Sequence, residues 1–156
     1  MSQPHGYGPV KQVHGLSLPL SLLLEADPSA RLIDGYRDTP YAWQISDQGQ
    51  TVAAAIAQQR NPQDWELMNI AVLPSYQSRG LGAQLLSTLI RSVREQGGQS
   101  LYVATGTIGY PLFFYQRAGF RVVAVEPDYF LQHYDEALFE DGLQHKDRLI
   151  LRLALN

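Results

Sequence analysis

Two glycines separated by one residue lie between an apolar segment and the start of an amphipathic one. The segment reads Gln77-Ser-Arg-Gly-Leu-Gly82, and its arginine, Arg79, adds one positive charge. The first amides of a helix have no partner within the helix, and the helix dipole places positive potential beside them. Glycine also lets a ligand approach the backbone closely. The pattern predicts a site for a phosphate or pyrophosphate at the start of the following helix.

The same turn also has a purely structural interpretation, in which the glycines allow close packing and bind no ligand. The usual nucleotide-binding motifs are absent, since no Lys-Ser or Lys-Thr pair follows Gly82 and no third glycine completes a dinucleotide pattern. Taken alone, the turn is compatible with both interpretations.

Strand and helix patterns alternate around this turn. Residues 65–73 have the continuous apolar character of a central strand, and leucines repeat on one helical face from Ala83 until Gly97-Gly98. The remaining expected elements are helices over 18–26, 30–36, 111–118 and 128–143, and strands over 41–46, 51–59, 101–105, 120–125 and 149–155. Residues 1–15 have no periodicity and are expected to form a loose arm. The whole chain, 1–156, is predicted to be one mixed α/β domain.

Composition excludes several classes of protein. The chain of 156 residues is 45% hydrophobic and has a net charge of −3 with no Lys/Arg-rich run, which argues against nucleic acid as a partner. It has no cysteine, and therefore no disulfide, thiolate zinc site or cysteine nucleophile. His133 and His145 lack metal-ligand spacing, so no metal is expected. The apolar run 16–24 contains Pro19 and is too short for a bilayer, so we expect a cytoplasmic protein with no membrane partner.

A second motif supports the ligand interpretation of the turn. The segment Tyr115-Gln-Arg-Ala-Gly-Phe120 places a tyrosine near the end of a short helix that a glycine terminates. With 77–82, it resembles two motifs of the GNAT superfamily of N-acetyltransferases, a Gln/Arg-x-x-Gly-x-Gly/Ala loop and a Tyr-x-x-x-Gly-Phe ending. The resemblance covers 40–125 well and 16–40 in outline, and 128–136 is similar to one group of bacterial members.

The resemblance implies a fold and a cosubstrate. The fold is a mixed, mostly antiparallel central sheet with a splayed middle, flanked by helices, with an extra helix between the last two strands. The cosubstrate is acetyl-coenzyme A (acetyl-CoA), with its pyrophosphate on the backbone amides of 78–83 and its pantetheine arm paired with 70–72, which could equally be plain core. An amide near Ala71 or Val72 would stabilise the oxyanion. The implied cofactor-binding residues are Ile70, Ala71, Val72, Gln77, Ser78, Arg79, Gly80, Leu81, Gly82 and Ala83.

The resemblance also implies two catalytic residues. Tyr115 matches the acid that protonates, or hydrogen-bonds, the departing thiolate, and its alternative role is that of a core tyrosine. Glu66 stands where some members of the superfamily carry a glutamate base for the amine. Its alternative is an outward-facing salt bridge. An asparagine that often precedes the tyrosine near the coenzyme is absent or replaced by a threonine in 105–109.

The acceptor is less defined than the acetyl donor. Residues 126–147 hold seven acids and one lysine, a local charge of −6, and would attract a cationic amine if they line the acceptor pocket, or form a solvated helix face if they do not. We expect an N-acetyltransferase acting on a small primary amine by direct attack in a ternary complex. The alternatives are a peptide or protein amine, a non-catalytic CoA-binding regulatory module, and a domain in which the glycine turn only packs. Because homodimers are common in this superfamily, the resemblance favours a homodimer.

Overall fold

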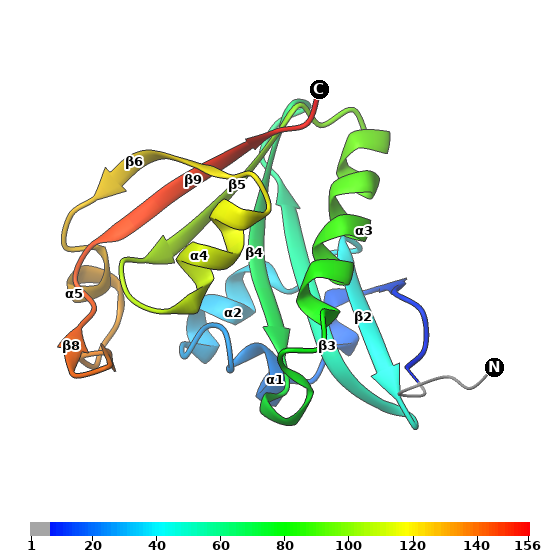
Figure 1. Cartoon of the computed structure of the whole chain (residues 1–156), viewed down its shortest axis with the longest axis horizontal. Helices are drawn as coiled ribbons and strands as arrows, with labels where there is room; N and C mark the ends of the chain where they lie inside the picture. The colour runs from blue at the N-terminus through cyan, green and yellow to red at the C-terminus, as the bar shows by residue number, and fades with distance from the viewer. Residues whose placement is uncertain (1–6) are drawn as a thin grey trace.

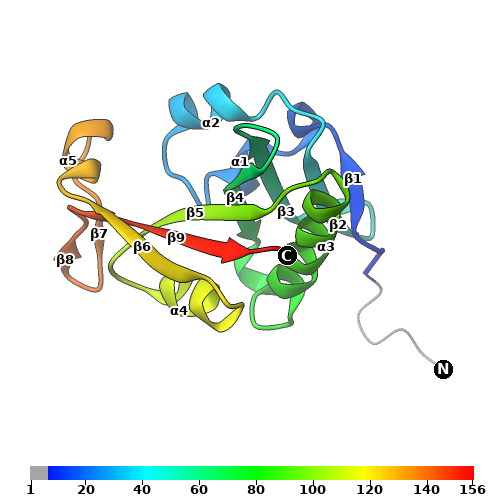
Figure 2. The same ribbon diagram turned by 90° about the horizontal axis from the view of Figure 1, so that it is seen from above.

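Apolar runs of strand length build a seven-stranded sheet in the order β1-β2-β3-β4-β5-β9-β6 (Figures 1 and 2). The computed structural model describes residues 7–156. The strands are Lys11–Val13 (β1), Ala42–Asp47 (β2), Gln50–Gln59 (β3), Asp64–Val72 (β4), Ser100–Gly106 (β5), Arg121–Glu126 (β6) and Arg148–Ala154 (β9), with a separate hairpin of Phe139–Glu140 (β7) and Leu143–Gln144 (β8). Neighbouring strands of the sheet are antiparallel except β4 and β5, which are parallel.

Helices cover both faces of the sheet. They are Leu20–Leu23 (α1), Ala30–Tyr36 (α2), Leu81–Glu95 (α3), Tyr110–Arg117 (α4) and Tyr129–His133 (α5), with 3-10 turns at Gly15–Ser17 (η1) and Pro74–Tyr76 (η2). Figure 2 shows α1 and α2 on one side of the sheet and α3 and α4 on the other. The leucine stripe of α3 is buried with Trp43 and Trp65 in one cluster, and α1 and α2 bury Leu22, Leu23 and Ile33 in a second. The sheet is thus the middle layer of three.

The middle of the sheet is splayed, as the resemblance implied. Strands β4 and β5 pair only between 64–67 and 100–103, after which they diverge (Figure 1). A β-bulge in β4 accompanies the divergence, since Asn69 pairs with Ile56 while Leu67 pairs with Ala57, which leaves Met68 as the extra residue. The carboxyl half of β4 therefore has a partner strand on one edge only.

The prediction of a loose arm over 1–15 is wrong for the part that the structure describes. Lys11–Val13 forms β1 and pairs with β2, and Tyr7 forms a bridge with Asp47. The backbone groups of these residues are satisfied by pairing with the edge of β2. Composition alone does not reveal this tertiary contact. The rest of that prediction concerns residues 1–6, which lie outside the described residues.

The prediction of one helix over 128–143 is wrong over most of its length. Only Tyr129–His133 is helical, and β7 and β8 form a hairpin after it. Asp141 and Gly142 join these strands with φ values of 51° and 79°. A two-residue hairpin loop with two positive φ angles favours an Asp-Gly sequence, which explains the turn. An extra helix does lie between β6 and β9, but it is short.

Among residues 7–156, no helix combines the length and the apolar character that crossing a bilayer requires.

Candidate active site

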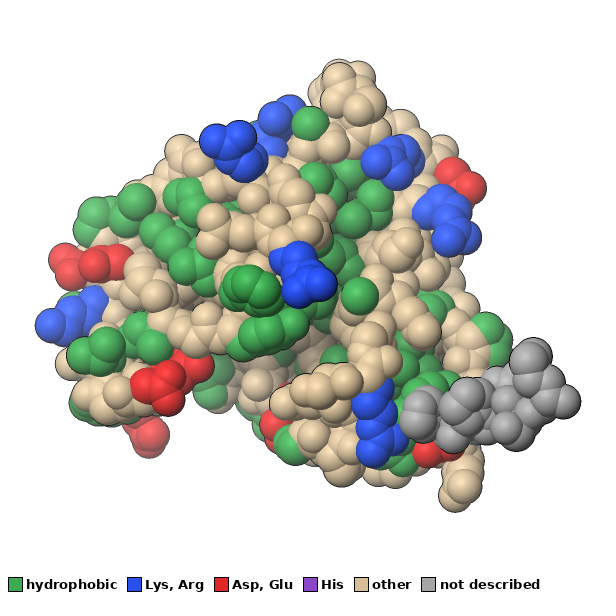
Figure 3. Space-filling model, viewed as in Figure 1, with side chains coloured by type: hydrophobic (Ala, Val, Ile, Leu, Met, Phe, Trp, Pro, Cys, Tyr) green, Lys and Arg blue, Asp and Glu red, His purple; other side chains and the backbone are tan. Residues whose placement is uncertain are grey.

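The divergence of β4 from β5 opens a cleft of about 1730 Å³. Its walls come from β4, from the turn and first residues of α3, from α4, from the α1–α2 connection, and from 127–147, here called the insertion. Figure 3 shows this face of the molecule hollowed between the insertion and α1. The cleft therefore connects the predicted anion turn with the acidic segment.

The turn before α3 presents unpaired amides to this cleft. Within residues 7–156, the backbone amides from Ser78 to Ala83 have no hydrogen-bond acceptor, and the first paired amide is that of Gln84, which donates to the Gly80 carbonyl at 3.1 Å. Ser78 and Gly80 have φ values of 64° and 81°, so two residues of the turn adopt the left-handed conformation. Free amides at the positive end of a 15-residue helix suit a pyrophosphate.

The side chains of the turn hold its shape. Gln77 donates from Nε2 to the carbonyl of Val72 at 3.1 Å, which ties the turn to the end of β4. Arg79 donates from Nη1 to the hydroxyl of Tyr7 at 2.7 Å and lies 5.1 Å from the ring centre of Tyr76. That hydrogen bond is the main reason why the pKa of Arg79 is raised. The side chains of Gln77 and Arg79 thus contact the protein, while the backbone amides of 78–83 stay unpaired.

Gly82 lies where α3, α4 and β4 converge. A β-carbon on Gly82 would lie 3.5 Å from the ring of Phe114 and 4.0 Å from Cγ2 of Val72. Those are ordinary contacts, so a single methyl group would fit and a branched side chain would extend into the cleft.

The free edge of β4 exposes alternate backbone groups. Leu73 donates its amide to the Val52 carbonyl at 2.9 Å, and 71 pairs with 54 in the same register. Because hydrogen-bonded and non-bonded pairs alternate in antiparallel strands, the amide of Ala71 faces β3, while those of Ile70 and Val72 face the opening. The extra residue at the bulge determines which amides of β4 face β3 and which face the opening. Of the two amides implied for the oxyanion, only that of Val72 faces the cleft.

Tyr115 is buried between aromatic rings at the cleft wall. It is 7% exposed, and its ring centre lies 5.4 Å from that of Phe114 and 5.7 Å from that of Phe120. Burial raises the pKa of the Tyr115 phenol, so the hydroxyl stays protonated at neutral pH. No group among residues 7–156 forms a hydrogen bond with this hydroxyl, which leaves a proton donor available to a ligand in the cleft.

Glu66 borders the cleft but is engaged by a cation. Its carboxylate forms an ion pair with Arg60, and the Glu66 side chain is 12% exposed whereas that of Arg60 is 52% exposed. Glu66 pairs with Gln58 and Tyr102 on the neighbouring strands. The salt bridge expected as the alternative is therefore present, and because the same carboxylate lines the cleft, its role as a base stays a prediction.

A network of polar groups that the sequence did not single out lies opposite Tyr115. Asp27 accepts hydrogen bonds from the hydroxyls of Tyr36 and Tyr134, each at 2.9 Å. Asn69 donates from Nδ2 to the Tyr36 hydroxyl at 3.0 Å and to the Leu23 carbonyl at 3.1 Å. Asn69 interrupts an apolar strand, which was the one available signal for its role. Nothing in the sequence pairs residue 27 with residue 134.

The insertion adds a histidine–carboxylate pair to the cleft. His145 Nε2 lies 2.9 Å from Oε1 of Glu140, and the His145 ring lies against Gly106 at the end of β5. The insertion therefore forms one wall of the cleft, but of the seven acids in 126–147 only Glu140 lines it. Among residues 7–156, no group of three or more His, Cys, Asp or Glu side chains could hold a metal ion.

Comparison with known proteins agrees with this geometry. The model of the acetyltransferase (GNAT) family matches residues 15–120. The chain is 36% identical over 135 residues to the protein named Uncharacterized N-acetyltransferase YvbK of Bacillus subtilis (strain 168), covering 86% of this chain and 87% of that protein.

Two solved structures are similar over nearly the whole chain. The IAA acetyltransferase from Bacillus cereus ATCC 14579 has a TM-score of 0.86 and 31% identity, with 93% of this chain and 97% of that chain covered. A GNAT family acetyltransferase from Elizabethkingia anophelis, with acetyl-CoA bound, has a TM-score of 0.86 and 27% identity, with coverage of 96% and 98%. With the unpaired amides of the turn and the splayed strands, these matches show that the chain belongs to the GNAT family of N-acetyltransferases, which use acetyl-CoA as the acetyl donor.

Proposed function

We propose that this chain transfers acetyl from acetyl-CoA to the primary amine of a small molecule, by direct attack in a ternary complex. The observation that carries the proposal is a pair of hydrogen bonds that bridges two walls of the cleft at its acceptor end. The insertion is joined to the α1–α2 region by the Tyr134–Asp27 hydrogen bond and by one from Arg31 Nη2 to the His133 carbonyl, at 3.2 Å. A bridged end favours a small acceptor, whereas a peptide needs a groove that is open at both ends.

The chain's own groups would hold the acetyl donor at three points. The amides from Ser78 to Ala83 would bind its pyrophosphate, and the free edge at Ile70 and Val72 would pair with the amides of its pantetheine arm. Acetyl-CoA supplies an acetyl group activated as a thioester. A cleft-facing amide of Ile70 or Val72 would then donate to the carbonyl oxygen as negative charge develops on it.

Tyr115 would assist the leaving thiolate, and Glu66 would accept the proton of the attacking amine. The phenol of Tyr115 would donate a hydrogen bond to the sulfur as the thiolate leaves, and its lack of another partner among residues 7–156 supports this role. Because burial raises its pKa, the phenol would stabilise the thiolate by this hydrogen bond and not by complete proton transfer. The amine must lose a proton as it attacks, and the Glu66 carboxylate would take it directly or through a water. No cysteine is present, which agrees with direct attack of the amine on the carbonyl carbon.

The test is transfer by the purified chain. The protein is incubated with acetyl-CoA and a panel of small primary amines and peptides, and free thiol and the mass of the acetylated product are measured. Turnover with small amines and not with peptides supports the proposal. Turnover with peptides alone would overturn it in favour of a peptide or protein acceptor. Acetyl-CoA binding without turnover on any amine would overturn it in favour of a regulatory module.

A further inference from the structure

Asp27 is a cleft-lining carboxylate with donors but no counter-ion. It accepts hydrogen bonds from two phenols and from the amide of Ser29, at 3.2 Å. The ion pairs among residues 7–156 involve five other carboxylates, and none involves Asp27. Neutral donors hold the carboxylate in place but do not cancel its charge, so it is ready to bind a cation.

The nearby cations have other partners. Arg148 donates to Glu126 at 2.6 Å and stacks 3.5 Å from the ring centre of Tyr129. Arg31 donates to the His133 carbonyl. Exposed Glu25, on the same wall, adds a further negative charge. None of the ion pairs among residues 7–156 involves Asp27 or Glu25, so this wall of the cleft carries two carboxylates without a paired cation.

Aromatic rings surround this carboxylate. Tyr36 comes from α2, whereas Tyr134 and Phe130, whose ring centres are 5.6 Å apart, come from the insertion. Burial, followed by the charge of Asp27, raises the pKa of Tyr134, which therefore remains a neutral hydrogen-bond donor. A carboxylate with aromatic side chains beside it is an arrangement that suits an organic ammonium group.

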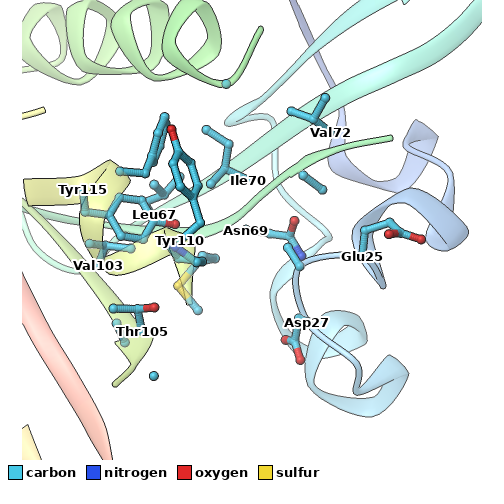
Figure 4. Close-up of a pocket in the computed structure, with 18 of the residues that line it drawn as sticks. Glu25, Asp27, Leu67, Asn69, Ile70, Val72, Val103, Thr105, Tyr110 and Tyr115 are labelled. Carbon is cyan, nitrogen blue, oxygen red and sulfur yellow. The ribbon is translucent and has the colours of Figure 1, made fainter. Parts of the chain in front are cut away.

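Asp27 lies near β4, the strand at which transfer is proposed, but does not contact it directly. Asn69 follows the bulge of β4 and reaches Asp27 through one intervening group, the Tyr36 hydroxyl. Figure 4 shows Asn69 between Ile70 and Asp27, with Tyr115 on the opposite side of the cleft. Asn69 is 4% exposed, and its Oδ1 has no partner among the described residues, so this wall also has an unused acceptor.

Building on the proposed function, we propose that Asp27 binds a second cationic nitrogen of the acceptor, and that the substrate is a small diamine. The reacting nitrogen must lose its proton to attack, and the base proposed for that proton is Glu66. Asp27 therefore contacts the other nitrogen, and a short aliphatic spacer places the neutral amine at β4. This makes Asp27 a specificity-determining residue for the transfer reaction.

The proposal is tested by binding, with and without turnover. The protein loaded with CoA is titrated calorimetrically with 1,4-diaminobutane and with 1-aminobutane, which have the same carbon chain and differ by one cationic nitrogen. We expect the diamine to bind at least about tenfold more tightly, with a preference that shrinks as ionic strength rises. Equal affinity of the wild-type protein for the two amines would overturn the proposal, whatever any variant does.

Two variants then assign the preference to one carboxylate. Asp27→Asn should weaken diamine binding about tenfold or more and leave monoamine and CoA binding unchanged. The control is Asp34→Asn, which removes the same charge from a site on α2 that is 71% exposed and outside the cleft. An Asp27→Asn protein that keeps the diamine preference, or an Asp34→Asn protein that loses it, would contradict the assignment. If diamine binds with this preference but acetyl is not transferred, only the proposed reaction fails.

Discussion

The hydroxyl of Tyr134 donates a hydrogen bond to Oδ1 of Asp27 across 107 residues of sequence, at 2.9 Å. It joins the insertion to the connection between α1 and α2, and so closes the acceptor end of the cleft. Burial and the charge of Asp27 both raise the pKa of Tyr134, because both disfavour a phenolate at this position. The same contact therefore relates the shape of the cleft to the pH dependence of stability.

Stability should fall as the pH rises above 10. The folded state keeps Tyr134 protonated, while the unfolded chain releases this proton near its ordinary pKa of about 10. The contribution is therefore fully present below pH 10 and is lost above it. Tyr134→Phe should reduce the slope of unfolding free energy against pH by up to about 1.4 kcal/mol per pH unit. Urea unfolding between pH 9 and 11 measures it, and an unchanged slope would contradict the raised pKa.

Gly82→Val should weaken acetyl-CoA binding about 30- to 100-fold, which corresponds to roughly 2–3 kcal/mol. The added methyl groups would meet Phe114 and Val72 and extend over the amides of the turn. The dissociation constant is measured by calorimetry, with Gln84→Val as the control, because Gln84 is exposed on the first turn of α3 and outside the cleft. Affinity equal to that of the control would show that the turn does not bind the coenzyme.

Tyr115→Phe should lower kcat about 10- to 100-fold and leave the dissociation constant of acetyl-CoA nearly unchanged. Because the hydroxyl has no partner among residues 7–156, its removal should not lower the melting temperature. The matched control is Tyr110→Phe, since Tyr110 also lines the cleft but is 65% exposed. A normal kcat for Tyr115→Phe would remove this residue from the mechanism, and a large loss of stability would show that the hydroxyl has a structural partner.

Glu66→Gln should lower kcat at least about tenfold if the carboxylate accepts the amine proton. The ion pair with Arg60 offers a matched comparison, because Arg60→Gln breaks the same pair and keeps the carboxylate. Steady-state kinetics and urea unfolding of both variants separate the two roles. Equal stability losses with unchanged kcat in both would assign Glu66 to structure alone.

The local motifs of the site could be predicted from the sequence, whereas the contacts between residues far apart in the sequence could not. The turn of 77–82 and the helix that carries Tyr115 were predictable because glycine positions and helix starts depend on neighbouring residues. The splayed sheet followed from the resemblance. Which amides of β4 face the opening was not predictable, since this depends on the extra residue Met68 opposite β3. The resemblance implied an oxyanion amide near Ala71 or Val72, whereas the amides that face the opening are those of Ile70 and Val72.

The acceptor side was the least predictable. Helical spacing over 128–143 was misleading because the Asp141-Gly142 turn was not weighed against it, although Asp-Gly is a strong hairpin signal. The Asp27 network unites residues from α2, β4 and the insertion, and no local pattern relates them. Such contacts depend on tertiary packing, which single-residue propensities do not describe.

The parallel pairing of β4 with β5 stops after Leu67, so the carboxyl half of β4 has hydrogen-bonding groups that no other strand satisfies. A molecule that pairs with this edge only in the folded chain adds RT ln(1 + [L]/Kd) to the unfolding free energy, about 2.7 kcal/mol at a concentration of 100 Kd. The ligand that the enzyme consumes would therefore also protect its fold, by an amount that rises with the logarithm of the ligand concentration.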